Sequence, residues 1–355
     1  MQKDFHYYAT YCAAFIAGFS HDESLQICYC AQLVDVCSRT FLQGIKGPDE
    51  AATTQLQLEL MEARTDLIGL QDITRIWSSF HFLPYDLYAE KKKCSKVYLQ
   101  KYRLICGPNG ALVSKTVELA KDRGPEAAGI AMHVLADTWA HRYFAGTPSL
   151  VINNTNYHFY EHMDSGERRK ISFRHSRSVP DDTENSIYTN SIYQGSENSV
   201  MNLGHGRAGH LPDYSYIHYS YLPAWANYEE YEKDNPTEYM KAFTQMIHAL
   251  KYLRSDCPAF LLDHYDTEAI AEYRGLIDEI LRKRQMDACE DWKCFGEKLS
   301  GQTIPDFDSE VYKKEYLEAK EGLLDKFIHA AMRQKSMVTE EIHRSGSFLA
   351  GRIKK

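Results

Sequence analysis

One apolar segment, from Pro125 to Phe144, carries three ionisable side chains at regular spacing. His133, Asp137 and His141 are four residues apart, so on an α-helix they form one stripe, whereas most residues between them are apolar. Burying a carboxylate between two imidazoles on an apolar helix is unfavourable unless the carboxylate is paired or bound to a cation. The segment therefore predicts a buried helix with a metal site on one face. The alternative interpretation is a hydrogen-bonded Asp–His cluster in the core.

Helical periodicity also dominates most of the remaining chain. Ser20–Glu23 has the pattern of a capping box that opens a helix, and Asp308–Gln334 has the pattern of one long amphipathic helix. Residues 147–222 are rich in Asn, Ser, Tyr and His and have no clear period, which predicts a long functional loop or lid. We expect a mainly α multi-helix bundle with this irregular insertion. Residues 1–265 would form a metal-binding catalytic domain, with C-terminal amphipathic helices over residues 266–355.

Composition limits the class of protein. The 355 residues are 44% hydrophobic and 25% charged, which excludes a disordered or collagen-like chain. Lys and Arg number 41 against 49 Asp and Glu, and the net charge of −8 disfavours generic binding to nucleic acid or anionic membranes. No apolar run approaches the roughly 18 residues of a membrane-spanning helix, and the N-terminal segment lacks signal-peptide features. Together with nine cysteines that show no metal-binding spacing, these features predict an unprocessed cytoplasmic protein without stable membrane insertion.

Further side chains of metal-ligand type are spread along the chain. They comprise an Asp-Phe-His start, an Asp inside an apolar helical run, a His between aromatic residues, and a Gly-rich segment with two His and one Asp. Imidazole and carboxylate ligands without thiolate clusters indicate a Zn, Mn or Fe site rather than a structural zinc site built from cysteines. The candidate metal ligands are Asp4, His6, Asp35, His81, His133, Asp137, His141, His205, His210 and Asp213.

The order of these ligands resembles that of the zinc-dependent phospholipase C / S1–P1 nuclease superfamily, whose members are all-α enzymes with three zinc ions. Three elements also resemble an uncharacterised bacterial family of DUF6765 type, over roughly residues 1–265. These elements are the Asp4-Phe-His-Tyr-Tyr8 start, the Phe80-His-Phe-Leu-Pro84 segment and the Gly-rich segment 204–214. The resemblance implies an all-α metal-dependent hydrolase.

The resemblance to the superfamily also implies how the ligands divide among the ions. Asp137 would bridge two zinc ions, the first held also by Asp35, His81 and His133, and the second by His6. His141, His210 and Asp213 would hold a third ion, with His205 competing for the same role. The superfamily's N-terminal Trp ligand has no counterpart here, and Asp4 is the candidate substitute. Both two and three ions therefore stay open.

These expectations lead to a metal-dependent phosphoester hydrolase of the phosphodiesterase, phospholipase or nuclease type. Two cations about 3.5–4 Å apart would clamp a metal-bound hydroxide, which attacks phosphorus. Asp137 would orient the attacking water and accept its proton, and Arg142 and Arg207 are the nearest cations in sequence for phosphate oxygens. We expect two or three Zn ions, with Mn or Fe as alternatives, and a phosphoester-containing small molecule, lipid or short nucleic acid as substrate. A homo-oligomer formed through the C-terminal helices is a further expectation.

Three alternative interpretations use other features or another function class. His158-Phe-Tyr-Glu161-His162 matches the inverted zincin pattern of some metallopeptidases. His21-Asp22 resembles the adjacent pair of HD-type phosphohydrolases. A non-catalytic, metal-stabilised binding or interaction protein would use the same ligands but fill every coordination position with side chains. The sequence contains no Walker loop, dinucleotide fingerprint or Gly-x-Ser-x-Gly elbow.

Overall fold

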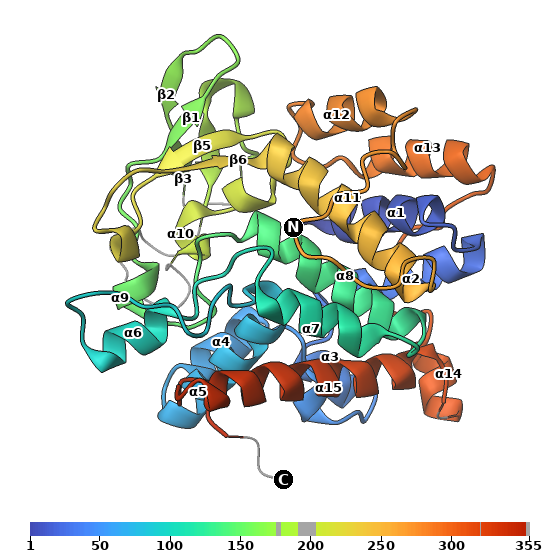
Figure 1. Ribbon diagram of the computed structural model, residues 1–355, viewed down its shortest axis with the longest axis horizontal. Helices are drawn as coiled ribbons and strands as arrows, with labels where there is room; N and C mark the ends of the chain where they lie inside the picture. The colour runs from blue at the N-terminus through green and yellow to red at the C-terminus, as the bar shows by residue number, and fades with distance from the viewer. Residues whose placement is uncertain (175–178, 191–203, 320, 353–355) are drawn as a thin grey trace.

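Helices build most of the molecule, as the sequence predicts, and a small sheet lies at one end (Figure 1). The computed structural model describes residues 1–174, 179–190, 204–319 and 321–352. The α-helices are α1 (Thr10–Ile16), α2 (His21–Leu33), α3 (Arg39–Gly44), α4 (Gln57–Ala63), α5 (Leu67–Ile76), α6 (Lys96–Tyr102), α7 (Ala111–Ala120), α8 (Pro125–Ala140), α9 (Leu150–Asn153), α10 (His205–Ala208), α11 (Asn235–Leu253), α12 (Arg274–Arg282), α13 (Cys289–Ser300), α14 (Lys313–Glu318) and α15 (Leu323–Arg344).

Shorter helical elements of other types connect these helices. Two are π-helical, η1 (Asp4–Ala9) and η3 (Trp77–His81). The 3-10 turns are η2 (Asp49–Ala51), η4 (Thr183–Asn185), η6 (Leu211–Asp213) and η7 (Ala224–Ala226).

Helix α8 lies in the middle of the molecule because it has almost no polar face. Every residue from Glu126 to Ala140 is buried, and α2, α7, α11 and α15 pack around the helix (Figure 1). Helix α8 approaches α2 closely at Gly129. A Cβ atom added at Gly129 would lie only 2.4 Å from the carbonyl oxygen of Ile27, so the absence of a side chain lets the two helices touch.

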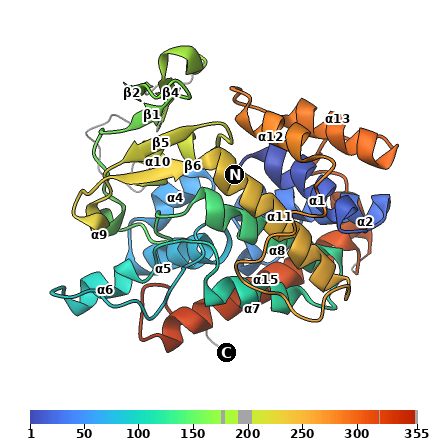
Figure 2. The ribbon, with the colours of Figure 1, turned by 45° about the horizontal axis from the view of Figure 1, so that its top comes forward.

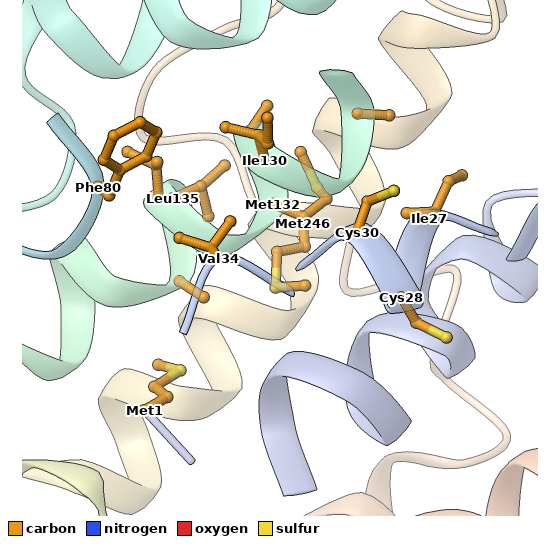
Figure 3. Packing of buried hydrophobic residues seen from close by; sticks show 14 of the residues in the cluster. Met1, Ile27, Cys28, Cys30, Val34, Phe80, Ile130, Met132, Leu135 and Met246 are labelled. Atoms are coloured by element: carbon orange, nitrogen blue, oxygen red, sulfur yellow. The ribbon is translucent and has the colours of Figure 1, made fainter. Parts of the chain in front are cut away.

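The apolar core around α8 draws on segments that are far apart in the sequence. Figure 3 shows Ile130, Met132 and Leu135 of α8 among Val34, which follows α2, and Met246 of α11. The cysteines largely behave as the small core residues that the sequence predicts. All nine are free thiols, and five of them are buried: Cys12, Cys28, Cys30, Cys37 and Cys106.

Two predicted helix starts are confirmed, and one predicted helix is wrong. Ser20 and Glu23 form the capping box of α2, and α8 begins at Pro125 after Gly124, whose φ is +89°. The predicted single helix over Asp308–Gln334 is instead α14 and α15, with a break between them. Glu321 has a φ of +86°, a left-handed conformation that a continuous right-handed helix cannot contain.

The prediction of an irregular 147–222 segment is only partly correct. Strands β1 (Tyr160–His162), β2 (Arg168–Lys170), β5 (His218–Tyr221) and β6 (Tyr231–Asp234) form an antiparallel sheet in the order β2-β1-β5-β6. Strands β3 (Ser172–Arg174) and β4 (Ile187–Thr189) form a separate parallel pair. The strands have only three or four residues, too few for alternation to stand out in the sequence. Residues 175–178 and 191–203 of the predicted lid lie outside the described residues.

The C-terminal helices cover the N-terminal part of the chain on two sides. Helix α13 packs on η1, whereas α15 packs on α8 and η3. In Figure 1 and in the turned view of Figure 2, α15 and the sheet lie on opposite sides of α8. Within the described residues, none of the helices combines the length and the apolar character needed to cross a bilayer.

Candidate metal centre

The predicted stripe on α8 meets histidines from two π-helical turns. His133 and Asp137 are buried on α8, and His141 follows its last residue. His6 comes from η1 and His81 from the last position of η3. A π-turn inserts an extra residue into a helix and so redirects the side chains that follow, which is why such turns recur at functional sites. Both turns here deliver a histidine to the same carboxylate.

Asp137 is the centre of this arrangement. Its Oδ1 lies 3.1 Å from His6 Nε2, and its Oδ2 lies 3.3 Å from His81 Nδ1 and 3.3 Å from His133 Nε2. His141 Nδ1 is 3.4 Å from the same Oδ2. The two carboxylate oxygens therefore face different sets of imidazole nitrogens.

Backbone carbonyl groups hold three of these rings in place. His133 Nδ1 lies 2.9 Å from the Ala31 carbonyl oxygen, and His81 Nε2 lies 3.0 Å from that of Thr53. His141 Nδ1 lies 2.7 Å from the carbonyl oxygen of His81 itself. A ring nitrogen can only donate to a carbonyl, so the opposite nitrogen of each ring is left to accept or to bind a cation. Histidine ligands of metals are commonly oriented in this way.

A second carboxylate extends the group on the other side of His141. Asp213 of η6 lies 3.2 Å from His141 Nε2 and 3.3 Å from His205 Nε2. His210 also contacts Asp213, at 3.4 Å, but its side chain is 47% exposed. His141, His205 and Asp213 can thus offer three mutually close ligand atoms. Of the two candidates for this position, the structure brings His205 into the three-residue group.

Around His133, the same rule of mutual closeness defines two further groups, His6–His133–Asp137 and Asp35–His81–His133. We call the combined set the metal-ligand cluster. It consists of His6, Asp35, His81, His133, Asp137, His141, His205 and Asp213.

The α-amino nitrogen of Met1 lies inside this cluster, which sequence analysis did not predict. It donates to Asp137 Oδ1 at 2.7 Å and lies 3.3 Å from Asp213 Oδ1. Burial alone would lower the pKa of this amino group, but Asp137, Asp213 and Asp35 raise it to about 11. The ammonium therefore supplies one positive charge among three carboxylates.

The ionisable groups of the cluster have pKa values that reflect burial and one another. Burial would raise the pKa of Asp137, yet His141, the Met1 amino group and His133 hold it well below the ordinary value. Burial lowers the pKa of both His6 and His141 to about 4. For His81, burial lowers the pKa but the contact with Asp137 outweighs it, and the pKa is raised. The cluster is therefore a buried site of excess negative charge, which favours cations.

Solvent reaches the cluster at only some of its members. The side chains of Asp35 and His205 are 31% and 24% exposed, whereas those of His6, His133 and Asp137 are at most 1% exposed. A molecule from solution would therefore approach along the Asp35 and His205 sides.

Asp4 lies close to the cluster in sequence but is engaged elsewhere. Its carboxylate accepts hydrogen bonds from the backbone N–H groups of Phe5 and Ala288, at 2.7 and 3.2 Å. These contacts join η1 to the start of α13. The groups of potential ligands found among the described residues do not include Asp4, and its predicted role in place of an N-terminal Trp stays a prediction.

The two predicted catalytic arginines have structural contacts. Arg142 binds Glu238 at 3.3 Å, stacks on the Tyr143 ring and lines a cleft of about 710 Å³. Arg207 is buried and donates to the Thr155 carbonyl oxygen at 2.6 Å. Their contact with a phosphate group stays a prediction.

The two alternative motifs lie in other settings. Glu161 of the His158–His162 pattern is buried in β1 and bound by Arg284 at 2.6 Å, whereas His162 lies on the partly exposed side of the strand. His21 begins α2 and pairs with the Tyr11 hydroxyl at 2.7 Å. Neither pattern belongs to the metal-ligand cluster.

Comparison with known proteins identifies the family. No curated protein and no solved structure matches the chain. The sequence profile of a family of unknown function (DUF6765) matches residues 1–342, beyond the residue 265 expected from the motifs and nearly to the end of α15. The chain therefore belongs to the DUF6765 family.

Proposed function

We propose that this protein is a metal-dependent phosphoester hydrolase whose metal-ligand cluster binds two or three divalent ions, zinc foremost. The ligand types support zinc because neutral imidazole and carboxylate are its usual partners in catalytic sites. Asp137, with one oxygen facing His6 and the other facing His81 and His133, is suited to bridge two ions.

The observation that carries the proposal is the convergence of His81 Nδ1, His133 Nε2 and Asp137 Oδ2. The two nitrogens are 3.4 Å apart, and each lies 3.3 Å from the same oxygen. Both rings direct their other nitrogen to a backbone carbonyl group, so neutral rings would present two lone pairs to a carboxylate. Only a proton or a cation between these atoms relieves the repulsion. In addition, His6 Nδ1 is buried without a hydrogen-bond partner in the described part of the chain.

Divalent cations at such a site supply Lewis-acid chemistry: they polarise a phosphoryl oxygen and lower the pKa of a bound water. The chain's own groups would do the rest. Asp137 would bind both ions, which fixes their separation, and would accept a proton from water. Asp35 and His205, the partly exposed members, would lie where the substrate enters. Substrates of the phosphodiester class, including lipids and short nucleic acids, fit this chemistry.

The order of ligands along the chain supports the same assignment through its resemblance to the phospholipase C / S1–P1 nuclease superfamily. Asp35, His81, His133 and Asp137 would form the first site, and His6 with Asp137 the second. The third would be His141, His205 and Asp213, with His205 in place of His210. This resemblance rests on ligand order alone, and no solved structure matches the chain.

Metal content and turnover of the purified protein test the proposal together. The wild type, stripped with chelator and reloaded with Zn²⁺, should hold two or three equivalents and hydrolyse bis-p-nitrophenyl phosphate. Asp137→Asn should lose metal and, with it, several kcal/mol of transition-state stabilisation, which is at least about a hundredfold in rate. His158→Ala, which alters an exposed histidine outside the cluster, is the matched control and should behave as wild type.

Three outcomes of these measurements would favour another interpretation of the site. A folded wild type that takes up no Zn²⁺ at the cluster contradicts the proposal and leaves a hydrogen-bonded polar network. Full metal uptake without turnover of any phosphoester supports the non-catalytic binding protein instead. Metal loss in a His21→Ala variant but not in Asp137→Asn favours the HD-like interpretation.

A further inference from the structure

The antiparallel sheet carries a second group of metal-ligand side chains, distinct from the metal-ligand cluster. These are His162 of β1, His218 of β5 and Glu232 of β6, and one ligand atom of each lies within 4.8 Å of the others. In the sequence, His162 stands out only as part of a peptidase pattern, and His218 and Glu232 belong to no recognisable motif.

The register of the strands explains why the three side chains meet. Tyr160 pairs with Ser220 across β1 and β5, so His162, two residues on, lies opposite His218. Ser220 in turn pairs with Glu232 across β5 and β6. Positions two apart on a strand share a face, and cross-strand neighbours on that face are in contact range. All three ligands therefore project from one face of the sheet.

Side-chain contacts hold these three residues close to one another. The two imidazole rings are stacked, with centroids 4.7 Å apart and an angle of 18° between their planes. The Glu232 carboxylate is bound by His218 Nε2. The hydroxyl group of Ser220 lies 2.8 Å from His162 Nε2 and helps to orient that ring. Two imidazoles and one carboxylate form a borderline ligand set of the kind that zinc uses.

The opposite face of the same strands belongs to the protein interior. Glu161 and Tyr219 are buried there, and buried Lys233 of β6 donates to the Trp139 carbonyl oxygen of α8 at 2.7 Å. The histidine face is open by comparison, since the side chains of His218 and Glu232 are 32% and 60% exposed. An ion on this face would be separate from the cluster and accessible from solution.

One neighbouring cation, Arg168 of β2, lies at the edge of the site, where it donates to the Ser220 hydroxyl at 3.3 Å. Arg168 pairs with His162 in the register, but its guanidinium lies 4.2 Å from the centre of the Tyr160 ring and binds Glu230. The Glu230 carboxylate therefore offsets part of its charge.

We propose that His162, His218 and Glu232 bind a divalent transition-metal ion, with Zn²⁺ as the reference ion, and that the bound ion links strands β1, β5 and β6. Three protein ligands leave a coordination position for water, as in open zinc sites. The ion would exchange with solution and stabilise the sheet against local opening. This site does not depend on the proposed hydrolase function.

Zinc titration of the full chain, stripped with chelator, tests the site. With a chromophoric chelator as competitor, the wild type should show one weaker equivalent of Zn²⁺ beyond those in the metal-ligand cluster. His218→Ala and Glu232→Ala should each lose this equivalent and keep the others. His158→Ala, which removes an exposed histidine just before β1, should lose none. The substituted side chains are partly exposed, so the variants should keep the wild-type circular dichroism and thermal transition.

The same titration of the Asp137→Asn variant distinguishes this proposal from the hydrolase proposal. In Asp137→Asn the weaker equivalent should persist although metal at the cluster is lost. If the cluster binds no zinc even in the wild type, a single equivalent that disappears in His218→Ala still supports the sheet site. Equal zinc stoichiometry in wild type, His218→Ala and Glu232→Ala overturns it.

Discussion

Oδ1 of Asp137 lies 3.1 Å from Nε2 of His6, although 131 residues separate them in the sequence. The other oxygen of the same carboxylate faces His81 and His133. One side chain thereby connects η1, η3 and α8. Because the proposed first ion has Asp35 and His81 as ligands besides His133, whereas the second has only Asp137 besides His6, the two histidines should not contribute equally to metal binding.

We predict that His6→Ala loses more zinc than His133→Ala. Under the proposed division of ligands, removing His6 leaves the second ion with Asp137 alone, whereas removing His133 leaves the first ion with Asp35, His81 and Asp137. The measurement is zinc per chain by mass spectrometry after equilibration with limiting free Zn²⁺, with His158→Ala as control. Equal losses in the two variants, with both proteins folded, would contradict this division of the ligands.

A second prediction concerns the contact between α2 and α8. Gly129→Ala should destabilise the protein by about 1–3 kcal/mol, because the new methyl group meets the Ile27 carbonyl oxygen and Cys30 Cβ. The free energy of unfolding in urea, measured without metal, is the readout. Gly275→Ala on α12 is the matched control, since nothing lies within 4 Å of its Cβ position. There the helix propensity of Ala should stabilise the protein by about 0.5–1 kcal/mol. A stabilised Gly129→Ala would show that α2 can move aside.

Much of the candidate site could be predicted because its centre is local in sequence. The spacing of His133, Asp137 and His141 on an apolar helix is visible without a structure, and the apolar surroundings predict burial. It is harder to predict which of the other histidines complete the ligand groups. His205 rather than His210 joins His141 because η6 brings Asp213 back toward α10, a tertiary relationship that no spacing rule encodes.

Other features had no signal in the sequence. The π-turns that redirect His6 and His81 depend on packing, and so do the backbone carbonyl groups of Ala31 and Thr53 that orient two rings. Strands of three or four residues are too short to show alternation, which is why the sheet and the pairing of His162 with His218 could not be predicted. The mainly α class was easier to predict because it rests on long periodic segments.

A third prediction is that a chain ending at residue 265 does not fold. The helices beyond this point pack on both π-turns. The rings of Trp292 of α13 and Phe5 form an edge-to-face pair with centroids 6.1 Å apart, and Gln334 of α15 donates to the Ser79 carbonyl oxygen. Without them, apolar surface around η1 and η3 would be exposed, and His6 and His81 would lose their positions. The truncated chain should show no cooperative thermal transition and no zinc binding. A stable, zinc-binding 1–265 fragment would instead establish the expected two-part organisation.

A final prediction follows from Lys335 of α15, which is buried against Asp72, Cys37, Arg75 and Arg39. Burial lowers the pKa of this ammonium to about 8, although the Asp72 carboxylate raises it in part. In the folded protein the side chain thus releases its proton near pH 8, whereas in the unfolded chain it keeps the proton up to the ordinary pKa of 10.5. Between these pH values the unfolded state binds more protons.

The free energy of unfolding should therefore contain a component that rises from about pH 8 to pH 10.5 and is constant below pH 8. Lys335→Met removes that component. At pH 7 the variant should be more stable than wild type by an amount on the order of 3 kcal/mol, since the buried charge is gone and Asp72 keeps Arg39 and Arg75 as partners. Urea denaturation of the two metal-free proteins at several pH values gives the difference, in which all shared titrations cancel. Lys326→Met, an exposed position on the same helix, should change stability by less than about 0.5 kcal/mol at any pH. A Lys335→Met variant that is destabilised at pH 7 would mean that the ammonium is a stabilising partner of Asp72. If the difference in the free energy of unfolding between the variant and wild type does not narrow as the pH rises, Lys335 does not lose its proton in the folded state.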